Sequence, residues 1–218
     1  MFEHVFEHVR GRTGEVLSRD DYLTDFSRVH AGDIGLLAKI ERGQSFQEPG
    51  SPSWEAFAAG DWPAALRLME DEREPIASYF RDAAARGLTF RRLRVVEFPI
   101  APYLQWEMHL LRLRAELGER IRVLDAGEIT ELERDAKLPE VVVLGRSVMY
   151  TVIYDAEGKG AGARRFTDPG LIRATVAEFK HLYARGESIA PFFEREIAPL
   201  APPAVRRPSA QLPEPSAH

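Results

Sequence analysis

The polar side chains best spaced to act together are three arginines, one tyrosine and one glutamate from a single short stretch of the chain. They are Arg92, Arg94, Arg122, Tyr103 and Glu107. Arginine presents a planar set of donors that suits carboxylate and phosphate groups, so this set could bind a small anionic ligand. An arginine turned towards the interior needs an anionic partner, and Glu107 is the natural candidate. Two interpretations stay open: an anion-binding pocket at the carboxyl edge of a sheet, or an ion-pair network that serves the fold.

The elements that must position these residues are a strand, a helix and a second strand. Residues 88–98 are rich in β-branched and aromatic side chains, and Arg92 and Arg94, two apart, share one face of the predicted strand. After a proline-containing break, apolar residues at helical spacing predict one buried helix face. They are Tyr103, Trp106, Leu110, Leu113 and Leu117. Gly118 is placed to end this helix. Residues 120–124 form the second strand, parallel to the first and either beside it or separated from it by one strand.

Two other groups of residues have spacings found in metal sites. One is an H-x-x-E-H pattern, which on a helix supplies two zinc ligands and a base; it consists of His4, Glu7 and His8. The other is a group of acids, Asp20, Asp21 and Asp25. The first lies at a chain end, where structure frays, and acids in the first turn of a helix are ordinary partners of the helix dipole. We therefore predict no metal site and no cofactor.

Motifs for covalent catalysis are missing from the sequence. The chain has no cysteine, no G-x-S-x-G and no H-x-K phosphodiesterase signature. The glycines between Asp155 and Gly162 lack the strand-before, helix-after setting of a phosphate loop, so they predict a hairpin turn instead. We therefore predict no catalytic residue.

Composition and charge narrow the classes of partner. The 218 residues include 29 Lys and Arg against 34 Asp and Glu, which gives a net charge of −5. Because phosphate neutralisation supplies most non-specific affinity for nucleic acids, we do not expect the chain to bind nucleic acid on its own. No apolar run approaches the roughly 20 residues that span a bilayer, and the N-terminus lacks the apolar core of a secretory signal. We predict a cytoplasmic protein without a membrane partner.

The pattern of elements divides the chain into three parts. Residues 1–87 form a mainly helical N-terminal region, in which residues 34–40 are an apolar segment of undecided type. Residues 88–200 form a mixed α/β domain built on the strand-helix-strand unit. Residues 201–218 are rich in Pro, Ala and Ser and predict a disordered tail, because they cannot bury enough apolar surface.

Within the second part, three further strands are predicted at residues 141–144, 147–155 and 163–167. A helix opens at Asp168-Pro169 and ends near Gly186. The fold class is therefore α/β, with α+β as the alternative: a mixed sheet of about five strands with flanking helices and the helical N-terminal region.

Ordered segments between Trp54 and Leu200 carry a family resemblance. They are R-V-V at residues 94–96, Y-x-x-W-E at 103–107, G-E-x-I-R-V at 118–123, L-P at 138–139, and Y-D followed by a glycine at 154–158. Together they resemble an uncharacterised actinomycete family, domain of unknown function 6879. The resemblance implies a setting beside helix-turn-helix regulators and an order of elements similar to non-catalytic phospholipase-D-like sensor domains.

These observations favour a non-enzymatic regulatory protein that binds a partner or ligand. Its partner would be a helix-turn-helix transcription regulator, to which it is an accessory, and its ligand a small anion. The alternative is a hydrolase or transferase that acts on an anionic substrate. In that case Arg92, Arg94 and Arg122 would hold the anion and Glu107 would act as acid or base.

Overall fold

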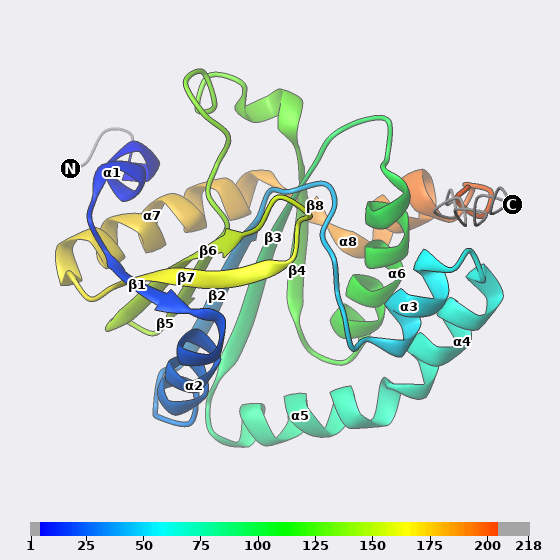
Figure 1. Cartoon of the computed structure of the whole chain (residues 1–218), viewed down its shortest axis with the longest axis horizontal. Coiled ribbons are helices and arrows are strands. Elements are labelled where there is room, and N and C mark those ends of the chain that lie inside the picture. Colours follow the sequence, from blue (N-terminus) through cyan, green and yellow to red (C-terminus); the bar gives the residue numbers. More distant parts are fainter. Residues whose placement is uncertain (1–4, 205–218) are drawn as a thin grey trace, which may run out of the picture.

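A computed structural model describes residues 5–204, and within them the chain folds around a mixed sheet of eight strands, β1-β7-β6-β5-β2-β3-β4-β8 in spatial order (Figure 1). The strands are β1 (Glu15–Ser18), β2 (Leu36–Glu41), β3 (Thr89–Val96), β4 (Arg120–Asp125), β5 (Val141–Leu144), β6 (Val148–Tyr154), β7 (Gly160–Phe166) and β8 (Glu187–Ser188). The α-helices are α1 (Val5–Gly11), α2 (Arg19–His30), α3 (Pro52–Ala58), α4 (Trp62–Asp71), α5 (Arg73–Ala85), α6 (Pro102–Glu116), α7 (Pro169–Arg185) and α8 (Ile189–Phe192).

The centre of the sheet is parallel and its outer parts are antiparallel. Strands β2, β3 and β4 run parallel, with Arg92 of β3 opposite Lys39 of β2 and Ile121 of β4. Strand β5 joins β2 antiparallel and leads into β6, β7 and the edge strand β1, while β8 pairs antiparallel with β4 at the other edge. The predicted strand-helix-strand unit is confirmed as β3-α6-β4, whose strands are direct parallel neighbours.

The mixed α/β class with flanking helices is confirmed, but the predicted number of about five strands is wrong. The sequence indicated β3 to β7, and the sheet contains β1, β2 and β8 as well. Strand β2 is the apolar segment whose type was undecided. Strands β1 and β8 have four and two residues and bury little, so no apolar alternation marks them and only pairing defines them. Because β1 and β2 lie within residues 1–87, the N-terminal region supplies part of the sheet.

Helices cover both faces of the sheet. On one face α1 and α7 pack on β2, β3 and β5 through side chains that include Phe6, Phe179 and Leu93. On the opposite face, α2 and α5 cover the sheet around Leu37 and Tyr150. Helices α6 and α8 cover β3 and β4 on that same face. The sheet is therefore the middle layer of three, and charged side chains on either face must be accommodated beneath helices.

Helix α6 is buried on two sides. The predicted apolar face packs against α3 and α4 through Tyr103, Trp106 and Leu113. A second apolar face, with Leu104 and Met108, packs on the sheet and α8. A single apolar stripe is typical of a helix with one side in solvent, whereas α6 lies between the sheet and two further helices. It therefore contributes to two cores.

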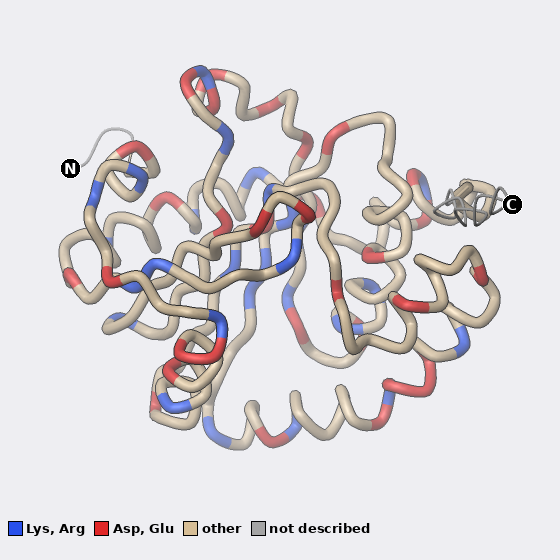
Figure 2. The backbone as a smooth tube through the Cα atoms, viewed as in Figure 1, with Lys and Arg blue, Asp and Glu red and all other residues tan. Residues whose placement is uncertain are grey.

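Charged residues occur in the central strands as well as at the surface (Figure 2). Lys39 and Glu41 of β2 and Arg92 and Arg94 of β3 alternate with apolar residues that face α7. Both arginines are buried, at 7% and 0% exposed. A buried charge needs a partner or a polar cavity. A binding site is therefore expected at this part of the sheet.

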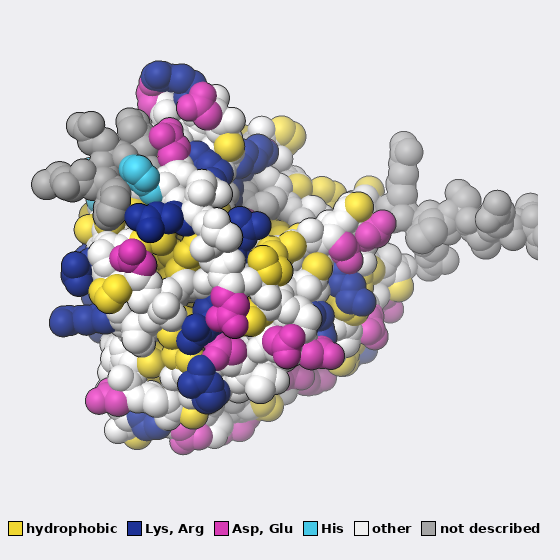
Figure 3. Space-filling view, turned by 60° about the vertical axis from the view of Figure 1, so that its left-hand side comes forward, with side chains coloured by type: hydrophobic (Ala, Val, Ile, Leu, Met, Phe, Trp, Pro, Cys, Tyr) yellow, Lys and Arg dark blue, Asp and Glu magenta, His cyan; other side chains and the backbone are white. Residues whose placement is uncertain are grey.

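The outer surface mixes charges of both signs. On the face in Figure 3, acidic and basic side chains are interspersed. None of the helices within residues 5–204 is long and apolar enough to span a bilayer. Of the predicted disordered tail, residues 201–204 have no regular element, and residues 205–218 lie outside the described residues.

Candidate functional site

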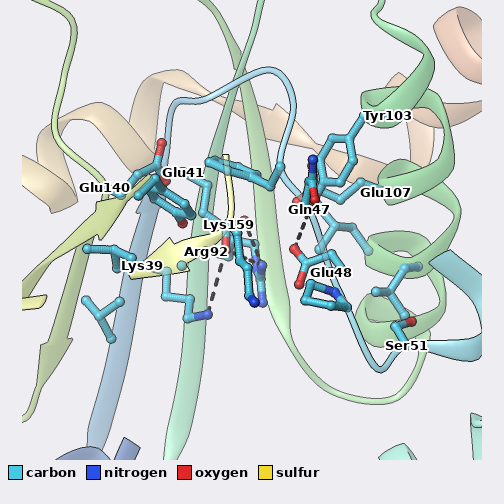
Figure 4. A pocket seen from close by; sticks show the side chains of 18 of the residues that line it. Lys39, Glu41, Gln47, Glu48, Ser51, Arg92, Tyr103, Glu107, Glu140 and Lys159 are labelled. Carbon is cyan, nitrogen blue, oxygen red and sulfur yellow. Dashed lines mark hydrogen bonds and ion pairs between the residues drawn. The ribbon is translucent and has the colours of Figure 1, made fainter. Parts of the chain in front are cut away.

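A cavity of about 520 Å³ lies between the sheet and helix α6. Strands β2 and β3 form its floor and α6 forms one wall (Figure 4). The loop that joins β2 to α3 forms another wall, and Gln47 N of this loop donates to Gly158 O of the β6–β7 hairpin at 3.0 Å. The backbone of Gln47 also bridges to Lys159. The cavity has the volume of a small-molecule site and is built from segments far apart in the sequence.

Arg92 lies on the floor of the cavity and is fully paired. Its Nη1 lies 2.6 Å from each carboxylate oxygen of Glu41, and its Nε donates to Glu119 Oε1 at 2.8 Å. Glu119 also accepts from Arg114 Nε. Two carboxylates therefore neutralise two guanidinium groups, and the donors of Arg92 are used within the protein rather than offered to a ligand.

Arg94 and Glu107 form the ion pair expected from the sequence. Arg94 Nε donates to Glu107 Oε2 at 2.7 Å, with the two side chains 0% and 7% exposed. Arg94 Nη1 donates to the carbonyl oxygens of Glu41 and Val95 at 3.2 and 3.1 Å. Glu107 lines the cavity, whereas Arg94 lies behind it. This pair therefore links β3 to α6 and uses one oxygen of Glu107, a residue that lines the cavity.

Arg122 is not brought to this cluster. In the parallel register it lies opposite Leu93, and Arg94 lies opposite Val123. Directly opposed side chains point to the same face of a sheet, so Arg122 points away from Arg92 and Arg94. Its Nη1 donates to Gly186 O at 2.7 Å and its guanidinium carbon lies 5.4 Å from the Tyr183 ring centroid. The predicted clamp of three arginines is therefore not assembled.

Tyr103 reaches the cavity from the first turn of α6. Its hydroxyl donates to Glu48 Oε1 at 3.0 Å, and its ring packs edge-on against Phe46, with centroids 5.7 Å apart. Phe46 in turn stacks on Tyr154 at 4.7 Å. Burial, together with nearby Glu107 and Glu48, raises the pKa of Tyr103, so this hydroxyl is a neutral donor. These rings give the cavity an aromatic wall.

Lys39 and Glu140 are among the cavity residues that were not identified from the sequence. Lys39 Nζ lies 3.7 Å from Glu41 Oε1, and its side chain is 30% exposed. Glu140, just before β5, accepts hydrogen bonds through Oε1 from Arg42 N at 2.7 Å and from Gly43 N. A lysine among apolar residues was the one local signal for Lys39. No local signal marks Glu140, because strand pairing brings it across from β2.

The protonation of these groups differs sharply. Burial, reinforced by the charge of Glu41, raises the pKa of Glu140 to about 7, although the two backbone donors oppose this. Burial also raises the pKa of Glu107 against the opposing effect of Arg94. For Glu41 the effect of burial is outweighed by Arg92 and Lys39, which lower its pKa to about 2.

Lys39 has the opposite tendency. Desolvation and the charge of Arg92 lower its pKa, while the 30% of its side chain that solvent reaches limits this effect. Near neutral pH the cavity therefore combines the side chain of Lys39, ionised Glu41 and a carboxyl group, Glu140, that can gain or lose a proton.

The residues whose spacing is typical of metal sites either have other roles in the structure or lie outside the described residues. Asp25 Oδ2 accepts from Tyr150 OH at 2.6 Å and Arg165 Nε at 2.7 Å, so it ties α2 to β6 and β7. His4 lies outside the described residues. Across residues 5–204, no group of three or more His, Asp or Glu side chains could hold a metal ion. The glycine-rich segment after Asp155 forms the β6–β7 turn, as predicted.

Comparison with known proteins places the chain in a family. The model of a family described as domain of unknown function (DUF6879) matches residues 25–194. The chain belongs to this family. The DUF6879 match confirms the resemblance predicted from the sequence, and it covers β2 to β8 and most of the cavity. The lining residues that precede it are Arg19, Tyr22 and Leu23 of α2. No curated protein matches the chain.

Proposed function

We propose that this DUF6879 protein is a non-enzymatic ligand-binding protein with a regulatory role. The observation that supports this most directly is a 520 Å³ cavity whose polar groups are only partly used by the protein itself. Arg92 and Arg94 are each held in internal ion pairs, and Arg94, whose Nη2 has no hydrogen-bond partner among the described residues, lies behind the cavity and does not line it. Lys39, in contrast, lies 3.7 Å from its nearest carboxylate oxygen, beyond hydrogen-bond distance, and remains available to a ligand.

In the proposed regulatory role, ligand binding in the cavity is signalled to a protein partner through the loop between β2 and α3. The loop after β2 touches the cavity through Phe46, Gln47 and Glu48, and the same loop leads directly into α3. A ligand that contacts this loop favours whichever loop position binds it best. We propose that a helix-turn-helix transcription regulator, in an actinomycete cytoplasm, is the partner that senses this loop.

A second candidate function is an enzyme that acts on an anionic substrate. The three-arginine site expected from the sequence does not support it, because Arg122 lies on the other face of the sheet. The observation in its favour is Glu140, whose pKa of about 7 suits proton transfer near neutral pH. In this alternative Lys39 would hold the substrate anion and Glu140 would act as acid or base.

Native mass spectrometry of the protein purified from its own host tests the proposal. We expect a small molecule to be retained by the wild type and lost in Lys39→Gln, while Lys180→Gln, at an exposed position of α7, retains it. The absence of any retained molecule or protein partner from the wild type would contradict the binding proposal. Conversion of the retained molecule during incubation would favour the enzyme instead.

A further inference from the structure

We infer that the ligand of this cavity is a small zwitterion with an aromatic ring, of the chemical class of the aromatic amino acids. The inference rests on the proposed ligand-binding function and specifies which molecule fits it. Three sets of groups support it: an amine for the ligand carboxylate, carboxyl groups for the ligand ammonium, and aromatic rings for the ligand's aromatic side chain. Figure 4 shows Lys39 on the sheet floor, with Glu140 to one side of it and Glu107 and Tyr103 on the helix side.

The anionic end of the ligand is assigned to Lys39. This ammonium group has a single ion-pair contact within the described residues, with Glu41 at 3.7 Å. The stronger bonds of Glu41 go to Arg92, at 2.6 Å through both of its oxygens. Lys39 therefore keeps donors for a ligand carboxylate. Arg19 and Lys159 also line the cavity and add positive charge.

The ammonium group of the ligand is assigned to Glu140, and Glu107 on the helix side is a second cavity carboxyl group that keeps an acceptor. Glu107 uses Oε2 for Arg94, and Glu140 uses Oε1 for the backbone of Arg42 and Gly43. No hydrogen bond within residues 5–204 reaches the second oxygen of either carboxyl group. An ammonium group has three donors and suits such acceptors. A ligand that is only an anion would leave both oxygens unpaired and facing its own negative charge.

The ring of the ligand is assigned to the aromatic wall. Phe46, Tyr103 and Tyr154 pack on one another at centroid distances of 4.7 and 5.7 Å. All three line the cavity, together with Tyr22 and Trp106. Aromatic rings favour offset or edge-on contact with a further ring. A flat aromatic side chain would therefore bury more surface here than a sugar or an inorganic ion.

The same geometry predicts the direction of proton exchange on binding. Glu140 faces Glu41 of β2, Arg94 of β3 and Tyr154 of β6, and its pKa of about 7 leaves it partly protonated near neutral pH. A ligand ammonium group beside it stabilises the carboxylate and releases a proton, whereas a purely anionic ligand favours proton uptake. The sign of this exchange separates the two kinds of ligand.

Calorimetric titration with three matched compounds tests the inference: L-phenylalanine, 3-phenylpropanoate, which lacks the amine, and 2-phenylethylamine, which lacks the carboxylate. We expect L-phenylalanine to bind at least about tenfold more tightly than either, since each truncation removes a charge-assisted contact. Equal or tighter binding of 3-phenylpropanoate would overturn the zwitterion. Failure of all three compounds to bind at millimolar concentration would overturn it too. The retained molecule sought by mass spectrometry tests the ligand-binding function separately.

Titration near pH 7 in two buffers with different heats of ionisation measures the proton exchange. For wild type with L-phenylalanine, we expect more proton release than for Glu140→Gln, and the difference belongs to Glu140. Lys39→Gln should weaken L-phenylalanine and 3-phenylpropanoate at least about tenfold and leave 2-phenylethylamine nearly unchanged. Lys180→Gln, far from the cavity on α7, should change none of them. Identical proton exchange in wild type and Glu140→Gln would contradict the contact assigned between Glu140 and the ligand ammonium group.

Discussion

Arg94 of β3 and Glu107 of α6 meet in the interior of the protein, with Nε and Oε2 2.7 Å apart and the arginine 0% exposed. The pair joins the first strand of the β3-α6-β4 unit to its helix. The two residues have different roles: Glu107 lines the cavity, whereas Arg94 lies behind it and holds Glu107 in place. The pair fixes the wall from which Tyr103 and Trp106 project.

Removing one member of this pair should destabilise the fold strongly. We expect Arg94→Met to lower the free energy of unfolding by about 3–5 kcal/mol, because it strands the carboxylate of Glu107 in the interior. The double variant with Glu107→Leu should lose much less than the sum of the two single changes. Urea-induced unfolding measures both. As a control, Arg81→Met, in an exposed pair with Glu74, should change stability little; strict additivity at Arg94 and Glu107 would contradict the assignment.

Glu140 should make the protein less stable as pH rises towards neutrality. Its folded pKa of about 7 lies above the ordinary value of 4.5, so the folded state holds the proton more tightly than the unfolded state does. The contribution of Glu140 to stability is therefore fully present below pH 4.5 and is lost as pH rises through 7, by about 1–3 kcal/mol. Glu140→Gln should flatten this part of the profile in thermal unfolding between pH 4.5 and 8. A profile unchanged by the substitution would argue against the raised pKa.

His109 should produce the opposite slope. Burial, together with the charge of Arg112, lowers its pKa from 6.5 to about 4, and its ring packs edge-on between Trp62 and Phe193. The folded state prefers the neutral ring, so this contribution is present above pH 6.5 and is lost as pH falls towards 4. His109→Phe keeps an aromatic ring and should remove that loss. The same thermal series measures it, and a steeper acid loss in the variant would contradict this account.

Arg122 should matter for stability and not for binding. Its bond to Gly186 O and its contact with Tyr183 lie on the sheet face away from the cavity. We expect Arg122→Gln to cost about 1 kcal/mol and to leave the affinity for L-phenylalanine within twofold of wild type. Lys39→Gln is the matched comparison, with the reverse pattern. If Arg122→Gln lost affinity for L-phenylalanine at unchanged stability, Arg122 would have to be counted among the ligand-binding residues.

Ser53 should be needed for the packing of α6 on α3. Its hydroxyl donates to Ala65 O at 2.8 Å and accepts from Trp106 Nε1 at 3.0 Å, and both bonds are buried. Ser53→Ala leaves a buried donor and a buried acceptor unpaired, so we expect a loss of about 2 kcal/mol in urea unfolding. Exposed Ser45 supplies the control: Ser45→Ala should have almost no effect. An equal effect of both substitutions would show that the two bonds contribute little.

The local sequence pattern was sufficient to predict the elements whose start, apolar spacing and end are all marked by their own residues. Residues 102–117 have a proline start, apolar helical spacing and Gly118 at the end, and α6 forms there. Asp168 caps α7 through bonds to the backbone of Gly170 and Leu171, as its position before Pro169 predicted. Membership of DUF6879 could also be predicted, since ordered short motifs along the chain carry it.

Tertiary structure decided what depends on pairing between distant segments. Arg122 differs from Arg94 in the face it occupies because of a parallel register that no local pattern contains, and a shift of one residue would reverse it. Glu140 and Lys39 reach one cavity because β5 pairs with β2, just over a hundred residues away in the sequence. The sequence by itself determined helices α6 and α7, strands β3 to β7 and the candidate pair Arg94–Glu107, whose partners lie within one strand-helix unit. Only strand order and register determined which charged groups are left for a ligand, since those are set by the packing of the whole sheet.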